Sequence, residues 1–210
     1  MPQYELIPLF PLSLVLLPGM PLPLHIFEER YKEMIGDVMP VDGEFGVVRA
    51  KDNGIVNIGC TARVERVVRQ YPDGRLDLLA VGQRRFRIVA LDEEKSYLRA
   101  EVEFFNDDDA REVPAELGQR AARAYRVLAE LEEPGSTPEE PKFELNRMSF
   151  RLAQFMADLD KRQTVLALRS EIERLEFLVR VTPEYTAQRQ RVMLAKRVGP
   201  LNGHVAGSLK

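Results

Sequence analysis

The sequence predicts an α+β fold, in which a small, mostly antiparallel β-barrel with one early helix precedes a C-terminal α-helical bundle. Up to residue 105, short apolar stretches, some with clear period-two alternation, are separated at close intervals by turn residues, as in small barrels. After the acidic break at 106–109, apolar residues recur every three or four positions, as in amphipathic helices. The chain therefore divides into a predicted barrel at 1–109, a helical bundle at 110–198 and a flexible polar tail at 199–210.

The composition of the 210-residue chain is that of a globular protein, because 45% of its residues are hydrophobic and 30% are charged. The formal net charge of -3 argues against a general nucleic-acid binder, which normally has a basic excess. Residues 1–110 hold 13 Lys and Arg against 19 Asp and Glu, whereas residues 111–210 hold 17 against 14. These opposite excesses favour docking of the two halves on each other.

A cytoplasmic location is expected from the cysteine content and from the N-terminal segment. The single cysteine, Cys60, allows no disulfide within the chain, which fits a reducing compartment. The apolar segment 6–27 has no basic region before it and holds five prolines, which would forfeit several backbone hydrogen bonds in a bilayer. A membrane span is therefore excluded.

The N-terminal segment predicts two strands and a helix. The first strand covers 4–9, and Pro8 indicates a position near a sheet edge. The turn pair Pro18-Gly19 precedes a second strand at 20–26. In that strand, Pro21 and Pro23 remove N–H donors from one edge only, which predicts an edge strand that pairs through Leu22 and Leu24. Two glutamates then open a helix at 28–38, where acidic residues favour the N-terminal dipole.

Further strands follow up to residue 105. We expect them at 44–50, 59–70, 76–81, 84–90 and 98–104. Tyr71-Pro72-Asp73-Gly74 is a strong hairpin turn, and Gly82-Gln83 indicates a turn or a bulge. The stretch 98–104 alternates most regularly and is the clearest half-buried strand.

The second half predicts several helices. The first has its apolar stripe at 117–131, and a solvated loop with three prolines follows at 132–141. A second helix is expected at 145–159 and a short one at 162–168. Ser170 and Glu173 form a capping box that opens the next helix. Thr182, followed by a proline, is expected to cap a separate last helix that ends at Gly199.

No catalytic or metal site is predicted, because the sequence has no phosphate-binding loop, no nucleophile elbow and no zinc-binding pair. His25 could serve as a base, but a partly buried ring bonded to the backbone is the favoured interpretation, and His204 lies in the tail. Cys60 could be reactive, but a small buried hydrophobe is favoured.

Two clusters of charged residues can each be interpreted as a functional site or as a structural feature. Arg84, Arg85 and Arg87 resemble an anion patch, but Arg85 and Arg87 would share one strand face, which favours a solvated surface. The acidic run at 107–109 could bind Ca²⁺, but no ligand series with a glycine follows, which favours a solvated linker.

Six segments of the front half occur in an order and spacing that resemble the N-terminal domain of the Lon (La) ATP-dependent proteases. They are L-I-P-L-F-P-L, L-L-P-G-M-P-L-P-L-H-I-F-E-E-R-Y, G-x-x-x-V-V, G-C-x-A-x-V, V-G-Q-R-R-F-R-I and Y-L-x-A-x-V. The helical half is similar through Arg162-Gln163 and Glu173-Arg174-Leu175. The resemblance implies a PUA-like β-barrel of about six strands followed by a helical bundle.

The resemblance also implies what the chain does and does not do. Lon proteases continue into an ATPase module and a Ser–Lys peptidase module, and neither fits after the matching residues. The chain thus resembles the stand-alone Lon N-terminal-domain proteins. Recognition of protein substrates or partners carries over, whereas proteolysis and ATP hydrolysis do not, so we expect no enzyme activity and no cofactor.

The leading functional hypothesis is a non-catalytic module that binds peptides or unfolded protein segments. Its candidate contact residues are Leu16, Met20, Leu22 and Leu24, because an edge strand cannot bury all of its apolar side chains equally. Met20, at the turn, is the residue expected to be accessible. The alternative for most of the set is a place in the core.

Two other classes of function remain open. PUA-like barrels in other families bind RNA, which Arg63, Arg66, Arg69, Arg84, Arg85 and Arg87 would favour only if they converged on one face. The acidic front half counts against nucleic acid. An enzyme with an unrecognised site is the third class, and no residue pattern supports it.

Overall fold

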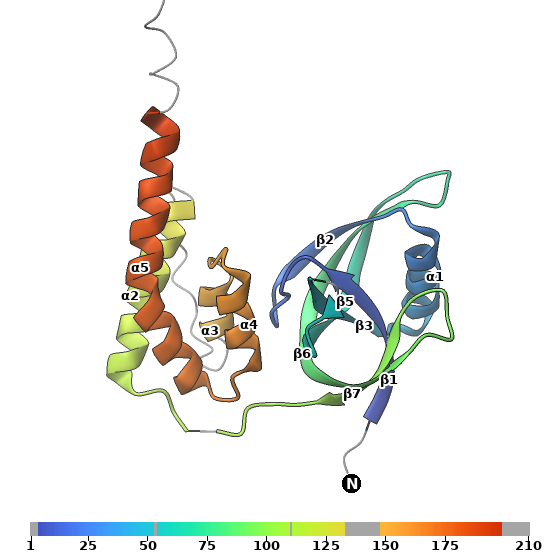
Figure 1. Cartoon of the computed structure of the whole chain (residues 1–210), viewed down its shortest axis with the longest axis horizontal. Coiled ribbons are helices and arrows are strands. Elements are labelled where there is room, and N and C mark those ends of the chain that lie inside the picture. The colour runs from blue at the N-terminus through green and yellow to red at the C-terminus, as the bar shows by residue number, and fades with distance from the viewer. Residues whose placement is uncertain (1–3, 53, 110, 133–147, 199–210) are drawn as a thin grey trace, which may run out of the picture.

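The computed structural model describes residues 4–52, 54–109, 111–132 and 148–198, which form a sheet side and a helix side lying next to each other (Figure 1). The strands are β1 (Tyr4–Leu12), β2 (Pro21–Ile26), β3 (Glu44–Lys51), β4 (Gly54–Ile55), β5 (Ile58–Gln70), β6 (Leu76–Asp92) and β7 (Arg99–Phe104). The helices are α1 (Glu29–Val38), the 3₁₀ turn η1 (Met39–Val41), α2 (Ala115–Glu132), α3 (Met148–Ala153), α4 (Leu159–Ala167) and α5 (Glu171–Val198). The predicted tail, most of the predicted loop at 132–141, Leu145 and His204 lie outside the described residues.

The strands form one sheet in the order β1-β7-β6-β5-β3-β4, and β2 pairs with β6 beside this path. All pairings are antiparallel except that of β1 with β3, where residues 9–12 run parallel to residues 46–49. Since β1 pairs with β7 as well as β3, the ladder that starts at β1 returns to it. The predicted combination of a mostly antiparallel sheet with separate helices is confirmed.

Pro8 lies where β1 is paired on one side, which agrees with the predicted position near a sheet edge. Residues 4–8 pair with β7, and the pairing with β3 begins only at residue 9. Pro8 is the last residue of the β7 ladder, and the following N–H, that of Leu9, donates to the Leu98 carbonyl at 2.7 Å. Proline has no N–H to donate, and Pro8 stands at the point where β1 stops pairing with β7 and starts pairing with β3.

The turn before β2 has the conformation that its sequence predicts. Gly19 has φ +75°, and the Met20 N–H donates to the Leu17 carbonyl at 3.0 Å. This is the pattern of a type II turn, which favours proline at its second position and glycine at its third. Pro18 and Gly19 occupy those positions.

β2 is an edge strand, as the prolines predict, because β6 is the neighbour with which it pairs. The Gly82 N–H donates to the Met20 carbonyl at 2.9 Å, so the backbone groups of Met20 and of every second residue after it point toward β6. Pro21 and Pro23 have the opposite parity and face the free edge. That edge therefore presents proline carbonyls without the matching donors.

β6 contains the irregularity expected at Gly82-Gln83. Cys60 of β5 pairs with Arg85, whereas Ala62 pairs with Gly82, so Thr61 stands opposite two residues in a bulge. A Cβ atom on Gly82 would lie 2.2 Å from the Leu17 carbonyl oxygen, which is closer than real contacts allow. Glycine is therefore required where the segment before β2 crosses β6.

One hydrophobic cluster extends from the sheet into the helices. Phe45 of β3, Met34 of α1 and Leu78 of β6 belong to it, as do Leu128 of α2 and Leu152 of α3, and each is at most 1% exposed. Four apolar residues of α1 are buried: Tyr31, Met34, Ile35 and Val38. Because the cluster is shared, the helices and the sheet are stabilised by the same apolar burial.

The helix side differs from the prediction at 145–159. α3 ends at Ala153, and α4 begins at Leu159 rather than in the region of residue 162. Asp158 explains the new start, because its side chain accepts hydrogen bonds from the backbone N–H groups of Asp160 and Lys161, as an N-cap does. Met148 and Leu152 before this break are buried, and Leu159 after it is half-buried. Met156, which lies in the break, is completely buried.

α5 begins as predicted but does not stop at Thr182. The Glu173 N–H donates to Ser170 Oγ at 3.4 Å, which is the first half of the predicted capping box. The expected separate last helix is wrong, because α5 continues through Pro183 to Val198. The Thr182 hydroxyl donates back to the Leu178 carbonyl at 2.7 Å instead of capping a new helix.

Candidate partner-binding surface

A buried ion network fixes the helices against the sheet. Arg174 of α5 is completely buried and donates to both carboxylate oxygens of Asp107, at 2.6 Å each. Arg85 of β6 donates to the same carboxylate at 2.5 Å and to the Leu168 carbonyl at 2.6 Å. The predicted solvated face is therefore wrong for Arg85, although Arg87 is exposed and pairs with Glu103 at 2.7 Å.

The predicted solvated linker at 107–109 is also wrong at Asp107. Burial of this carboxyl raises its pKa, but the hydrogen bonds and charges of Arg174 and Arg85 outweigh that effect and hold the pKa below its usual range. Arg174 is also bonded to Glu171 at 2.7 Å, and Ser149 Oγ donates to the same Glu171 oxygen at 2.6 Å. Asp107 thus links the sheet to α5, and Glu171 extends the network to Ser149 of α3.

One surface that this scaffold leaves open on the sheet side is the outer side of β2. We call Pro21, Pro23, His25 and Phe27 the β2 surface; the first three lie on the strand, the fourth directly follows it, and all four are exposed. Phe27 is 58% exposed, the largest exposed fraction of any phenylalanine in the described residues. Because strand side chains alternate, Phe27 has the same parity as the two prolines. This alternation is visible in the sequence, but the predicted contact residues were the leucines on the opposite face of the strand.

The structure separates the four predicted contact residues into two groups. Leu16 and Leu22 are 1% and 3% exposed and lie in the main core, so a partner cannot reach them in this state. Met20 and Leu24 are half-buried and pack against that core. Leu16 and Leu22 therefore lie in the core, as the alternative interpretation has it. Met20 and Leu24 remain candidates to form part of the contact with a partner.

An aromatic cluster extends the β2 surface toward the β5–β6 hairpin. The His25 ring stacks on Phe27 with centroids 5.9 Å apart and meets Tyr71 edge-on at 6.0 Å. His25 Nδ1 lies 2.5 Å from Asp77 Oδ1, and the Tyr71 hydroxyl donates to Asp77 Oδ2 at 2.8 Å. The expectation of a partly buried ring bonded to backbone is wrong, because the ring is exposed and bonds to a carboxylate. The guanidinium of Arg69 lies 4.5 Å from the Tyr71 ring centroid.

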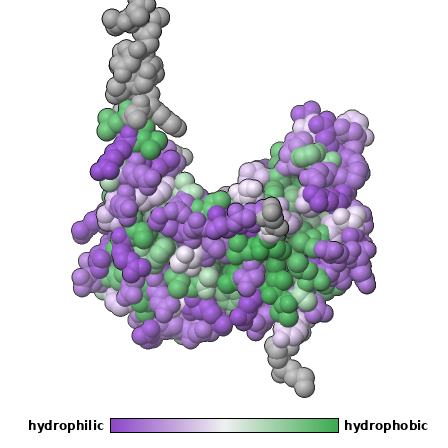
Figure 2. All heavy atoms as spheres, in the orientation of Figure 1, coloured by the Kyte–Doolittle hydropathy of each residue, from purple (hydrophilic) through white to green (hydrophobic). Residues whose placement is uncertain are grey.

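The surroundings of this surface include a hollow and a cavity. Figure 2 shows the molecule hollowed between the end of the long helix α5 and the sheet side. A separate cavity of about 480 Å³ lies at the junction, and its lining includes Pro18, Phe105 and three arginines. The arginines already have carboxylate partners: Arg84 with Glu44, Arg85 with Asp107, and Arg111 with Asp109. The cavity therefore offers no free cation for an anionic ligand.

Reactive groups are few in the described part of the chain. Cys60 is completely buried, and burial raises the pKa of its thiol to about 12, which favours the predicted structural role. Across residues 4–52, 54–109, 111–132 and 148–198, no group of three or more His, Cys, Asp or Glu is placed to hold a metal ion. None of the helices in these ranges is long and apolar enough to cross a membrane.

The arginines that would favour RNA do not converge. Arg85 is buried, and Arg63, Arg84 and Arg87 pair with carboxylates. Within the described residues, Arg66 and Arg69 are the members of the set that lack a carboxylate partner. Two such arginines would attract nucleic acid weakly, because nucleic-acid binders contact several phosphates with basic side chains.

Comparison with known proteins relates the whole fold to one family. A crystal structure of a Lon N-terminal domain protein from Xanthomonas campestris has a TM-score of 0.67 and 28% identity, covering 83% of this chain and 97% of that one. The N-terminal domain of a Mycobacterium avium complex Lon protease has a TM-score of 0.65 at 19% identity, covering 86% of this chain and all of that one.

Curated relatives are full-length proteases. Lon protease from Cytophaga hutchinsonii is 22% identical over 84% of this chain, and Lon protease 2 from Myxococcus xanthus is 30% identical over 60% of it. The matches span 24% and 17% of those two proteins, so the chain corresponds to about a quarter of their length or less. The family model for the ATP-dependent protease La (LON) substrate-binding domain matches residues 6–193. The chain therefore belongs to the family of Lon substrate-binding domains.

Proposed function

We propose that this chain is a non-catalytic module that binds unfolded or partly folded protein segments, or a protein partner, through the β2 surface. Family membership supports the binding of protein substrates. In this proposal, residues 1–109 act as a PUA-like barrel that carries the contact surface, and residues 110–198 act as a helical bundle that supports it. The chain itself neither hydrolyses ATP nor cleaves peptides.

The observation that carries the proposal is the exposure of Phe27 and of two prolines on the preceding strand. The Phe27 ring is 58% exposed and directly follows an edge strand whose outer face carries Pro21, Pro23 and His25. Aromatic and arginine side chains are enriched at protein interfaces, and Tyr71 with Arg69 extends the β2 surface. Covering most of the Phe27 ring would contribute roughly 1–2 kcal/mol to binding.

The backbone of β2 favours recognition by side chains over strand addition. An incoming strand would pair with the free edge of β2, where Pro21 and Pro23 have no N–H to donate. Apolar contacts are not directional, so they tolerate side chains of varied shape. A surface of this kind suits unfolded segments of varied sequence.

Binding of a dye-labelled, reduced and alkylated model protein, followed by fluorescence anisotropy, tests the proposal. We expect Phe27→Ser to weaken binding by roughly five- to tenfold, since 1.4 kcal/mol corresponds to a factor of ten. Leu91→Ser is the matched control, because Leu91 is 52% exposed but lies at the opposite end of β6, beside β7. Circular dichroism verifies that both variants fold. Equal affinity of Phe27→Ser and wild type would remove the β2 surface as the contact.

A further inference from the structure

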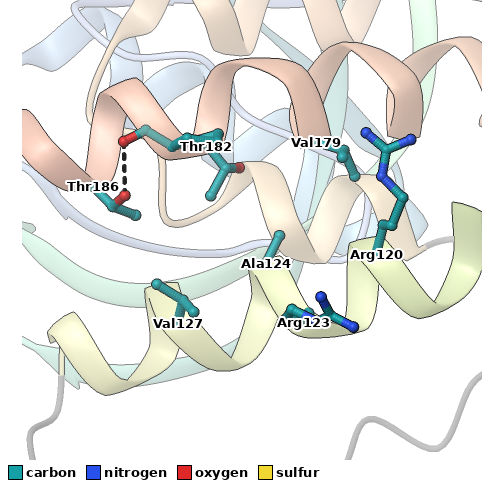
Figure 3. Close-up of a pocket in the computed structure, with 8 residues that line it drawn as sticks. Arg120, Arg123, Ala124, Val127, Val179, Thr182 and Thr186 are labelled. Carbon is teal, nitrogen blue, oxygen red and sulfur yellow. Dashed lines mark hydrogen bonds between the residues drawn. The ribbon is translucent and has the colours of Figure 1, made fainter.

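The helix side carries a groove that the proposed function does not use. It lies between α2 and α5, encloses about 340 Å³ and is shown in Figure 3. Its lining consists of Arg120, Arg123, Ala124, Val127, Val179, Thr182, Pro183 and Thr186. None of these residues belongs to the β2 surface, so the groove is a separate site.

The floor of the groove is apolar because the polar groups of its threonines are already engaged. The Thr186 hydroxyl donates to the Pro183 carbonyl at 2.9 Å, drawn as a dashed line in Figure 3, and the Thr182 hydroxyl donates to the Leu178 carbonyl. Val127 is 43% exposed at the α2 wall. An apolar side chain from a ligand would therefore cover apolar surface without leaving a threonine hydroxyl unbonded.

One acceptor in the groove lacks its helical donor. Pro183 has no N–H, so the Val179 carbonyl does not receive the hydrogen bond from four residues later that an α-helix normally provides. Val179, to which that carbonyl belongs, and Pro183 both line the groove. A backbone or side-chain N–H of a bound peptide would supply the donor.

Two arginines set the charge of the groove. Arg120 and Arg123 are exposed, lie one turn apart on α2 and extend from one end of the groove in Figure 3. Within the part of the chain that the structure describes, neither guanidinium has an ion pair or a hydrogen bond, whereas Arg189 farther along α5 pairs with Glu132. An apolar floor beside two available guanidinium groups is complementary to an apolar side chain flanked by carboxylates.

We propose that the α2–α5 groove binds a short acidic peptide segment in which a leucine-like side chain sits between glutamates or aspartates. The apolar side chain covers Val127, Val179 and Pro183. The flanking carboxylates pair with Arg120 and Arg123, and a peptide N–H bonds to the Val179 carbonyl. The groove thus recognises the peptide by its acidic and apolar side chains. This second site does not depend on the β2 surface.

A fluorescein-labelled ten-residue peptide of leucine and glutamate, titrated into the full chain, is the probe. We expect saturable binding that weakens as salt is raised, because exposed ion pairs are screened. Replacing the glutamates with lysines should abolish binding, and replacing the leucines with serines should weaken it by roughly tenfold.

Charge reversal on α2 locates the site. The double variant Arg120→Glu and Arg123→Glu should bind the peptide at least roughly tenfold more weakly. Arg126→Glu is the control for each of the two substitutions, because it makes the charge change of one of them on the same helix at an exposed residue outside the groove. Phe27→Ser should leave peptide binding unchanged, which separates this proposal from the function proposed for the β2 surface.

Three results would overturn the proposal: no saturable binding of the acidic peptide by the wild type, an unchanged affinity in the double variant, or an equal loss in Arg126→Glu. Sedimentation of the wild type and the double variant tests the other occupant, a second copy of this chain. A dimer that the double variant disrupts would assign the groove to self-association and contradict the acidic peptide as its ligand.

Discussion

Arg174 and Asp107 form a two-pronged hydrogen-bonded ion pair, with both bonds 2.6 Å long, across the boundary between the helix side and the sheet side. Arg174 belongs to α5 and Asp107 follows β7, so the pair joins residues 67 positions apart. A planar guanidinium matches both oxygens of a carboxylate, and the Arg174 guanidinium is completely buried. The position of the helices relative to the sheet therefore depends on this contact.

Replacing the buried guanidinium should destabilise the protein strongly. Arg174→Met removes both hydrogen bonds from α5 to Asp107 and leaves Glu171 with its hydrogen bonds from Ser149 but without its cation. Removal of one member of a buried pair typically costs about 3–5 kcal/mol. Urea unfolding measures the change. Arg169→Met is the control, because Arg169 pairs with Asp108 at an exposed position and should cost about 1 kcal/mol or less. Similar costs for the two variants would contradict the role assigned to Arg174.

The same network predicts how stability depends on pH. Because the folded-state pKa of Asp107 lies below its unfolded value, which is about 3.9, ionised Asp107 stabilises the fold above that pH. This contribution is lost as the pH falls through the folded pKa. The difference in unfolding free energy between wild type and Asp107→Asn should therefore be constant from about pH 5 to 7 and shrink below about pH 4. A difference that grows on acidification would have the wrong sign.

Gly82 should tolerate no side chain. In Gly82→Ala, the new Cβ would meet the Leu17 carbonyl oxygen at 2.2 Å, and the required shift of backbone should cost roughly 2–3 kcal/mol in unfolding free energy. Gly118→Ala is the opposite case, because Gly118 lies in α2 with no atom within 4 Å of an added Cβ. That variant should be more stable by up to about 1 kcal/mol. Thermal unfolding of both variants checks the pair, and a neutral Gly82→Ala would show that the crossing is looser than described.

Restoring a backbone donor in α5 should stabilise the helix. Pro183→Ala supplies the N–H that the Val179 carbonyl lacks and removes a helix-breaking ring, so an increase of roughly 1–3 kcal/mol in unfolding free energy is expected. Chemical denaturation gives the value. A loss of stability would mean that the proline ring contributes packing that outweighs the missing hydrogen bond.

Local patterns were the predictable part of this fold. The turn at Pro18-Gly19, the edge strand β2 and the helix α1 each depend on residues close together in the sequence, so local patterns were enough to identify them. The bulge at Gly82 followed from the same kind of signal. These features have one physical basis, which is that turn chemistry and side-chain periodicity act over a few residues.

The long-range contacts were not predictable in this way. Arg85 has the sequence context of an exposed strand residue, and its burial depends on Asp107 and on the Leu168 carbonyl, which only the folded chain brings near it. Pro183 has the sequence context of a helix start, but tertiary packing against α2 keeps α5 continuous. Phe27 was missed for a simpler reason: the leucine-rich face of β2 drew the prediction, although that face belongs to the core.

The most direct test of the β2 surface is to map the contact on the chain itself. The ¹⁵N-labelled protein is titrated with an unlabelled, reduced and alkylated model protein, and backbone amide shifts are followed by NMR. We expect the perturbed amides to gather at residues 22–27 and 69–77, around Phe27 and Tyr71. Perturbations confined to the α2–α5 groove, or no perturbation at saturating ligand, would contradict the account.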